Sequence, residues 1–226
     1  LKMHASEIPQ WAEERGKALN HFSAIEPGRT VLINIDMQTV FLAEGQIYAN
    51  PHARDIVGNV NRLSRAMRAA GAPVIWTRQT HTAEGSFAPP IWQYDVSRAD
   101  VAAGVAALQA DADGHALYPA MEVDGRDIVI DKYRYGALSC PAGALAAALK
   151  RLDAAMVIIT GTLTNCCCES TAREANMAGY KVIVVSDATA AVTAAEHNAA
   201  LLNVRINFAD VRRTDGVLRM IAAPCQ

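Results

Sequence analysis

Short runs of β-branched and apolar residues alternate with helical stretches along most of the chain, and this alternation constrains the fold more than any other feature. The runs read VLINI, PVIWT, DIVID, MVIIT and KVIVVS, and a shorter strand is expected at residues 209–211. Runs that are apolar on both faces are typical of strands buried on both sides. Strands that alternate with helices require right-handed crossovers. The sequence therefore predicts an α/β fold with a doubly wound, mainly parallel sheet and helices on both faces.

The stretches between the runs carry helical signals. Residues 51–70 place Ile56, Val60, Leu63 and Met67 at spacings of three and four, after a proline and before a glycine, which predicts an amphipathic helix. Further helices are expected at residues 141–152, 166–180 and 193–207. The stretch 78–125 has weak periodicity, and a loop this long in a compact domain is often functional.

Composition excludes several classes of protein. The chain has 226 residues, 51% of them hydrophobic, and a formal net charge of -2. Residues 1–226 are predicted to form one domain, with residues 1–29 as an N-terminal extension. No apolar run approaches the roughly 18 residues of a membrane span, and no long basic run suggests nucleic acid or a membrane surface as the partner. The opening segment does not resemble a secretion signal, so we expect a cytoplasmic protein that binds a small molecule.

Three predicted strands end in residues that can carry chemistry. Asp36 follows VLINI, Lys132 follows DIVID, and the turn GTLTNCCCES follows MVIIT. In a parallel sheet, ligands bind beyond the carboxyl ends of the strands, near the point where the strand order reverses. The sequence thus predicts a carboxylate, an ammonium group and a thiol at one edge of the sheet. Taken singly, each residue is explained as well by a turn, by solvation or by packing.

The five cysteines are unevenly placed: Cys140 and Cys225 stand alone, and residues 166–168 are all cysteine. An odd number suits no disulfide framework, and zinc ligands are usually two to four residues apart. Adjacent helical residues diverge by about 100°, so at most one of the three thiols is expected to face a pocket. A helix N-terminus and Lys132 are expected to lower the pKa of that thiol, and Asp36 is a suitable acid and base.

The segments VLINIDMQTVF, DIVIDKYRYGAL and VIITGTLTNCCCESTAREANMAGYKVIVVSDA resemble the isochorismatase-like cysteine hydrolases. This superfamily includes nicotinamidase, N-carbamoylsarcosine amidase and ureidoacrylate amidohydrolase, and the resemblance spans about residues 30 to 215. It implies a Rossmann-like α/β fold and hydrolysis of a C–N bond in a small amide, carbamoyl or ureido compound through a thioester. It also implies a homodimer or homotetramer.

The resemblance assigns roles residue by residue. The Asp–Lys–Cys triad of the family corresponds to Asp36, Lys132 and Cys167, because the nucleophile lies three residues beyond the threonine of the G-x-x-T motif. The backbone N–H groups of Leu163 and Cys167 would form the oxyanion hole. The family's cis peptide bond would precede Leu163. Cys166 and the cysteine at 168 are then expected to point into the adjacent core.

Other positions bear on the substrate. Zinc-containing nicotinamidases carry an Asp-x-His motif after the second strand, where this chain has Gln79 and His81. An amide oxygen replaces carboxylate poorly on zinc, so the sequence predicts no metal and no cofactor. Phe41, His81 and Tyr135 are expected to line the substrate pocket, although core packing explains the aromatic residues equally well.

Two other functions remain open on this fold. An isochorismatase-type vinyl-ether hydrolase would need no nucleophilic cysteine, and a non-catalytic binding protein would need no triad. Nucleotide binding is disfavoured, because no G-x-G-x-x-G or P-loop motif follows a strand.

Overall fold

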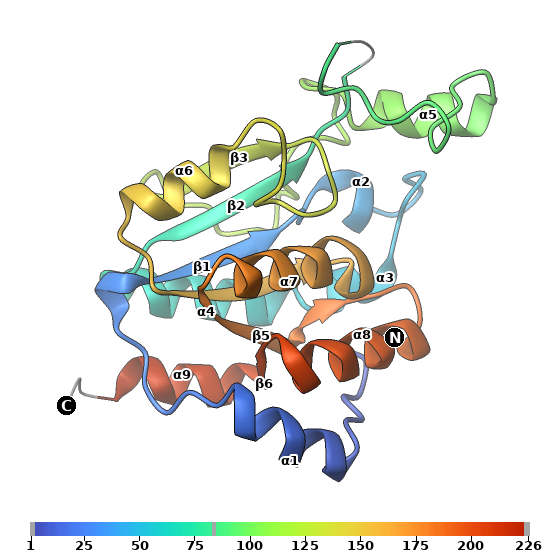
Figure 1. Cartoon of the computed structure of the whole chain (residues 1–226). Coiled ribbons are helices and arrows are strands. Elements are labelled where there is room, and N and C mark those ends of the chain that lie inside the picture. The colour runs from blue at the N-terminus through green and yellow to red at the C-terminus, as the bar shows by residue number, and fades with distance from the viewer. Residues whose placement is uncertain (1–2, 83–84, 224–226) are drawn as a thin grey trace.

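The computed structural model describes residues 3–82 and 85–223, and its centre is a six-stranded sheet in which every pairing is parallel (Figure 1). The strand order is β3-β2-β1-β4-β5-β6. The chain runs outward from β1 to one edge and then returns to build the other half from β4, so the order reverses between β1 and β4. The predicted doubly wound fold is confirmed. The strands are β1 (Thr30–Ile35), β2 (Val74–Gln79), β3 (Ile128–Lys132), β4 (Met156–Thr162), β5 (Lys181–Ala190) and β6 (Asp210–Arg212).

Helices cover both faces of this sheet (Figure 1). One face packs against α3, α4 and α9, and the other against α6, α7 and α8. The helices are α1 (Gln10–Leu19), α2 (Thr39–Leu42), α3 (Pro51–Asp55), α4 (Val57–Ala69), α5 (Ala99–Ala107), α6 (Ala144–Arg151), α7 (Glu169–Met177), α8 (Ala194–Asn207) and α9 (Thr214–Ala222), with short helical turns η1 (Pro27–Arg29) and η2 (Thr164–Cys168). Within the described residues, none of these helices is both long and apolar enough to cross a membrane.

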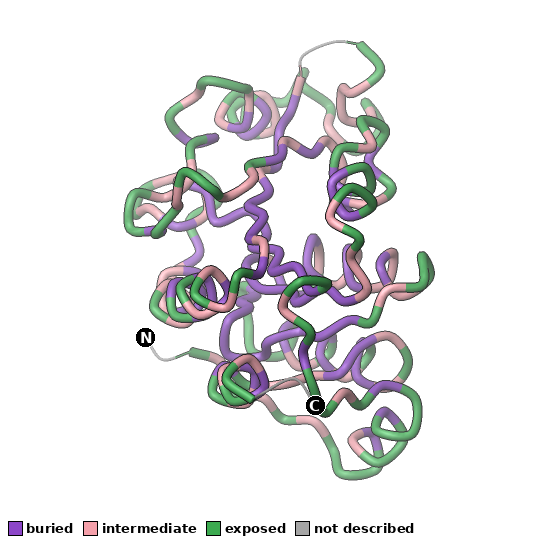
Figure 2. Tube along the Cα trace, turned by 90° about the vertical axis from the view of Figure 1, so that its left-hand side faces the viewer, coloured by how far each residue is buried: buried purple, intermediate pink, exposed green. Residues whose placement is uncertain are grey.

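The core consists of two layers because successive strand residues point to opposite faces. Leu32 and Ile158 pack on the side of α4 and α9, whereas Ile33 and Ile159 pack on the side of α6, α7 and α8. All four side chains are fully buried, and Figure 2 shows the buried strands running through the middle of the molecule. This explains why the runs in the sequence are continuously apolar rather than alternating.

The structure differs from the sequence prediction mainly at helix ends and in the long stretch 78–125. The helix expected over 51–70 is divided at Ile56 into α3 and α4. The weakly periodic stretch contains α5, which has a nearly uniform apolar composition and therefore little amphipathic signal. In the N-terminal region, α1 packs on α8, where the carboxylate of Glu13 lies 2.7 Å from Arg205.

Gly161 permits the closest approach between the two central strands. It pairs with Ile35 at the end of β1, and its φ of 110° is a conformation that L side chains rarely adopt. A Cβ atom at this position would clash with the backbone of Ile35. Glycine therefore keeps the end of β1 beside the turn that follows β4.

Replacing Gly161 by alanine is expected to lower the free energy of unfolding by about 3 kcal/mol or more, because both the dihedral angle and the contact with Ile35 are unfavourable. Urea unfolding followed by circular dichroism measures the change. Gly58→Ala is the matched control. Gly58 lies in the first turn of α4, and a Cβ atom added there would meet no atom within 4 Å. The control should be neutral or stabilising by up to about 1 kcal/mol, and an equal loss in both variants would contradict this role of Gly161.

Candidate functional site

Asp36 and Lys132 form a buried ion pair at the carboxyl ends of β1 and β3. Oδ2 of Asp36 lies 2.8 Å from Nζ of Lys132, and each side chain is 1% exposed. The other carboxylate oxygen of Asp36 accepts a 2.7 Å hydrogen bond from the hydroxyl of Thr77 on β2. Asp36 has a positive φ of 49°, which turns the chain sharply at the end of β1. The long lysine side chain reaches across β2 to this carboxylate, as the strand order requires.

The ammonium group of Lys132 is fully engaged. Besides Asp36, it donates to Oε1 of Gln79 at 2.6 Å and to the carbonyl oxygen of Arg134 at 3.0 Å. These two acceptors and the ion pair with Asp36 surround the ammonium group. Burial alone would lower the pKa of Lys132, but its interactions with Asp36 and Cys167, above all the negative charge of Asp36, outweigh burial and raise the pKa above its usual range. Lys132 is therefore a fixed positive charge at neutral pH.

The turn after β4 begins at the peptide bond between Thr162 and Leu163, which is cis, as the resemblance implies. The following residues form η2, a π-helical turn in which the N–H of Cys168 donates to the carbonyl oxygen of Leu163. Cys168 points into the core and is 1% exposed, as expected. Cys166 packs against the same core, as expected, but it is only half-buried and also lines the cavity with Cys167, so the expectation that only one thiol faces a pocket is wrong. A π-helical turn is wider than an α-helical one, so two neighbouring thiols can face one cavity.

The two thiols at this turn influence each other. Their mutual hydrogen bond lowers the pKa of Cys166 and raises that of Cys167, and burial raises the pKa of Cys167 further. Lys132 acts in the opposite direction on Cys167, but the nearby charge of Asp36 works against it. The pKa of Cys167 is therefore raised, whereas the sequence predicts a lowered one. Such a thiol needs a base to accept its proton.

A cavity of about 520 Å³ opens over this turn. The predicted lining residues Phe41, His81 and Tyr135 all border it, together with Leu163 and Cys167. Sequence analysis missed several other lining residues, most of which come from loops without periodic pattern. These are Ile47, Tyr48, Ala49, Gln79, Gln93, Tyr94, Leu108, Thr162 and Val192.

Tyrosine hydroxyl groups border one part of the cavity. The hydroxyl of Tyr94 lies 2.6 Å from that of Tyr135, which also accepts a hydrogen bond from the side chain of Gln93 at 3.2 Å. The edge of the Tyr94 ring faces the imidazole of His81, with 5.0 Å between the ring centroids. Tyr94 and Gln93 belong to the long stretch after β2, so this stretch contributes part of the cavity wall.

His81 is 4% exposed, and its Nδ1 atom has no hydrogen-bond partner among the described residues. Burial lowers its pKa to about 4, and the charges of Lys132 and Arg134 contribute to the shift. The imidazole is therefore neutral at pH 7. Gln79, at the position of a potential carboxylate ligand, uses its side-chain oxygen to accept the hydrogen bond from Lys132. In the described part of the chain, no group of three His, Cys, Asp or Glu side chains is arranged to hold a metal ion.

A histidine of α8 contacts the first residue of the cysteine turn. Nδ1 of His197 lies 2.9 Å from the hydroxyl of Thr164, the first residue of η2. His197 is fully buried, and the centroid of its tilted ring lies 5.1 Å from that of His4, whose centroid is 4.1 Å from that of His52. Burial, His4 and His52 lower the pKa of His197 to about 4. The neutral form of His197 therefore holds the turn in place.

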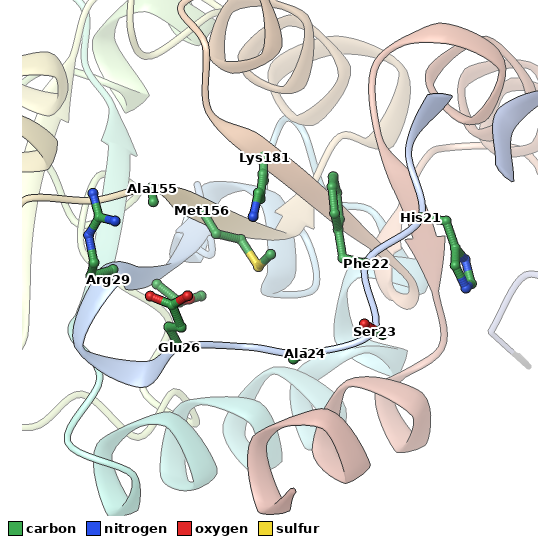
Figure 3. A pocket seen from close by; sticks show the side chains of 10 residues that line it. His21, Phe22, Ser23, Ala24, Glu26, Arg29, Ala155, Met156 and Lys181 are labelled. Carbon is green, nitrogen blue, oxygen red and sulfur yellow. The ribbon is translucent and has the colours of Figure 1, made fainter. Parts of the chain in front are cut away.

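A second cavity lies at the amino ends of the strands, at the other end of the sheet from the cysteine turn. Its volume is about 240 Å³, and Thr30, Met156 and Lys181, the first residues of β1, β4 and β5, border it. Figure 3 shows Lys181 and Met156 on this edge, with Arg29 and His21 at the two ends of the row of side chains. None of the predicted site residues lines this cavity. Since ligands of doubly wound sheets bind at the carboxyl ends of the strands, the cavity over the cysteine turn is the candidate site.

Cys225, the last of the five cysteines, lies outside the described residues.

Comparisons with known proteins identify the family to which the chain belongs. The model of the isochorismatase domain family matches residues 30–216. Nicotinamidase 3 of Arabidopsis thaliana is 29% identical over 84% of this chain and 87% of its own length. A ureidoacrylate amidohydrolase of Methylobacterium radiotolerans is 31% identical over 82% of this chain and 76% of its own length. The crystal structure of a cysteine hydrolase from Pseudomonas syringae pv. phaseolicola superposes with a TM-score of 0.81 at 29% identity, covering 90% of this chain and 97% of the other.

We expect the stability of the protein to depend on the protonation of His197. Its folded pKa of about 4 lies below the usual value of 6.5, so the unfolded chain binds the proton more tightly. The contribution of neutral His197 to the free energy of unfolding is present above about pH 6.5. It is lost as the pH falls toward 4, by up to about 3 kcal/mol. Urea unfolding at pH 7.0 and pH 4.5 measures the loss. His197→Gln keeps a polar side chain but cannot titrate, and an equally steep loss in this variant would contradict the role of His197.

Proposed function

The chain belongs to the isochorismatase family, and from this membership we propose that it is a cysteine-dependent amidohydrolase. The substrate is a small amide, carbamoyl or ureido compound whose C–N bond is cleaved through a thioester. Two relatives, a nicotinamidase and a ureidoacrylate amidohydrolase, are named for reactions on such compounds. The observation that carries the proposal is the buried pair of Asp36 and Lys132, whose charges act directly on the thiol of Cys167 at the floor of the cavity.

In the first half of the reaction, Sγ of Cys167 attacks the carbonyl carbon and its proton moves to Asp36. The raised pKa of Cys167 makes this transfer necessary. Oδ2 of Asp36 accepts no hydrogen bond from the described residues beyond its ion pair with Lys132, so it has a lone pair for the proton. Lys132 stabilises the negative charge as it passes from carboxylate to thiolate.

The tetrahedral intermediate places a negative charge on the former carbonyl oxygen. The backbone N–H groups of Leu163 and Cys167 are the proposed donors to this oxyanion, because both residues border the cavity at the cysteine turn. Preorganised donors of this kind typically contribute roughly 3–4 kcal/mol each to transition-state stabilisation. Asp36 then protonates the departing nitrogen, and the C–N bond breaks to leave a thioester on Cys167.

In the second half, Asp36 takes a proton from water, and the resulting hydroxide attacks the thioester. The acid product leaves, or a carbamic acid that decomposes, and the thiol of Cys167 regains its proton from Asp36. No step requires a metal ion. The amide of Gln79 is a poor zinc ligand, and its oxygen already accepts a hydrogen bond from Lys132. A vinyl-ether hydrolase would leave the thiol at the cavity floor unused.

Replacing Cys167 by alanine is expected to reduce kcat by about 10⁴-fold or more, because no other residue replaces the nucleophile. Cys166→Ala and Cys168→Ala are the matched controls and should keep more than about a tenth of the activity, since neither sulfur forms the thioester. Ammonia release from a panel of primary amides, carbamoyl amino acids and ureido acids measures turnover, and mass spectrometry detects the acyl adduct. Equal losses in all three variants would refute the assignment.

Asp36→Asn preserves the shape of the side chain but cannot exchange a proton, so kcat is expected to fall by about 10³-fold or more. The matched variant is Thr77→Val, which removes the hydrogen bond to Asp36 and leaves the carboxylate in place. That variant should lose no more than about tenfold. Both are compared at equal folded fraction, determined by circular dichroism. Retention of activity in Asp36→Asn would rule out the proton transfers assigned to Asp36.

A further inference from the structure

Among the described residues that line the candidate cavity, none has a formally charged side chain at pH 7. The described residues that line it are apolar, aromatic, amide, hydroxyl, imidazole or thiol in character. Phe41, Ile47, Leu108 and Val192 are among its apolar lining residues, and Tyr48, Tyr94 and Tyr135 bring hydroxyl groups to it. A carboxylate that enters such a cavity gives up water without gaining an ionic partner, which is costly.

The nearby cations lie behind the lining of the cavity rather than in it. Lys132 is paired with Asp36 and donates to Gln79 and to the carbonyl oxygen of Arg134. Nη1 of Arg134 donates to the carbonyl oxygens of Phe87 and Tyr133, at 3.2 and 2.6 Å. Neither side chain borders the cavity. Neither is therefore placed to bind an acidic group of a substrate.

The one basic side chain among the described lining residues is His81, and it is neutral at pH 7 because burial and Lys132 lower its pKa to about 4. A neutral imidazole offers one donor and one acceptor rather than a charge. Its Nδ1 atom is buried and has no partner in the described structure. The imidazole ring borders the cavity, as do the hydroxyl-bearing rings of Tyr94 and Tyr135, and these neutral groups suit an uncharged polar atom on the substrate.

We infer that the substrate is a neutral amide with an apolar or aromatic body, and that the site rejects amides whose non-reacting end carries a carboxylate. The inference rests on the proposed function and narrows it, because ureido acids such as ureidoacrylate are anions. It assigns Tyr94, Tyr135 and His81 to recognition of an uncharged polar group, and the surrounding aromatic and aliphatic side chains to the body of the substrate. The volume of about 520 Å³ accommodates a compound the size of a substituted benzamide.

Two isosteric pairs of primary amides test this inference. They are 4-methylpentanamide with succinamate, and 4-isopropylbenzamide with 4-carbamoylbenzoate, in which an isopropyl group replaces a carboxylate of the same shape. Ligand-observed NMR on Cys167→Ala measures binding, and ammonia release by the unaltered protein measures kcat/KM. We expect the neutral member of at least one pair to bind, and its kcat/KM to exceed that of its anion by about 100-fold or more.

A charged side chain at position 192 should weaken the preference for neutral substrates, because Val192 borders the cavity and is 56% exposed. Val192→Arg supplies a cation at the rim and should reduce the neutral-to-anion ratio by about tenfold or more. Val192→Met has a side chain of comparable length without charge, and it should keep the ratio within about threefold of the original protein.

The possible results distinguish a failure of the inferred substrate preference from a failure of the proposed hydrolysis. If the anion binds as well as its neutral partner, or if neither member of either pair binds, the inference is wrong. If the neutral amides bind to Cys167→Ala but the unaltered protein releases no ammonia from them, the preference for neutral ligands stands and the proposed hydrolysis fails. If the anions bind and are hydrolysed faster, the proposed function stands and the preference for neutral substrates is overturned.

Discussion

The ion pair between Asp36 and Lys132 is the interaction on which the rest of the site depends. Removing both charges from water costs several kcal/mol per ion, and their attraction offsets that cost only with good geometry and further hydrogen bonds. Here Thr77 satisfies one carboxylate oxygen, and Gln79 satisfies the ammonium group. Both of these partners lie on β2, the strand between the two charges. The strand order of the sheet thus provides the conditions under which the pair is stable.

The same pair controls the electrostatics of the cysteine turn. A lone lysine beside Cys167 would favour a thiolate, but Asp36 counteracts this effect, and burial and the neighbouring thiol raise the pKa of Cys167. Gly161 holds β4 against the end of β1, which keeps this turn close to Asp36. From the other side, His197 supports Thr164. The geometry of the turn is therefore held by contacts with β1 and α8, both distant in sequence.

Sequence patterns predicted the central part of the molecule well. The five long strands fall within a few residues of the predicted runs, because strands covered on both faces need continuous apolar side chains. Asp36, Lys132 and Cys167 came together because each follows a strand whose carboxyl end is at the same edge. The loop residues Tyr94 and Gln93 were missed, since no periodic pattern marks them and their position depends on how residues 78–125 fold over the cavity. The expectation of a single thiol at the cavity failed for a local reason, because the expected α-helical turn is π-helical.

The sequence by itself determined the class of fold, the edge of the sheet that carries the site, and the chemical groups available there. These properties follow from local patterns: apolar runs, helical spacing and the residues directly after each strand. The tertiary structure alone decided that Cys166 shares the cavity with Cys167, that the pKa of Cys167 is raised, and that the described wall of the cavity is uncharged. Each of these properties depends on burial and on charges brought close from distant parts of the chain, and no local pattern encodes the distances between them.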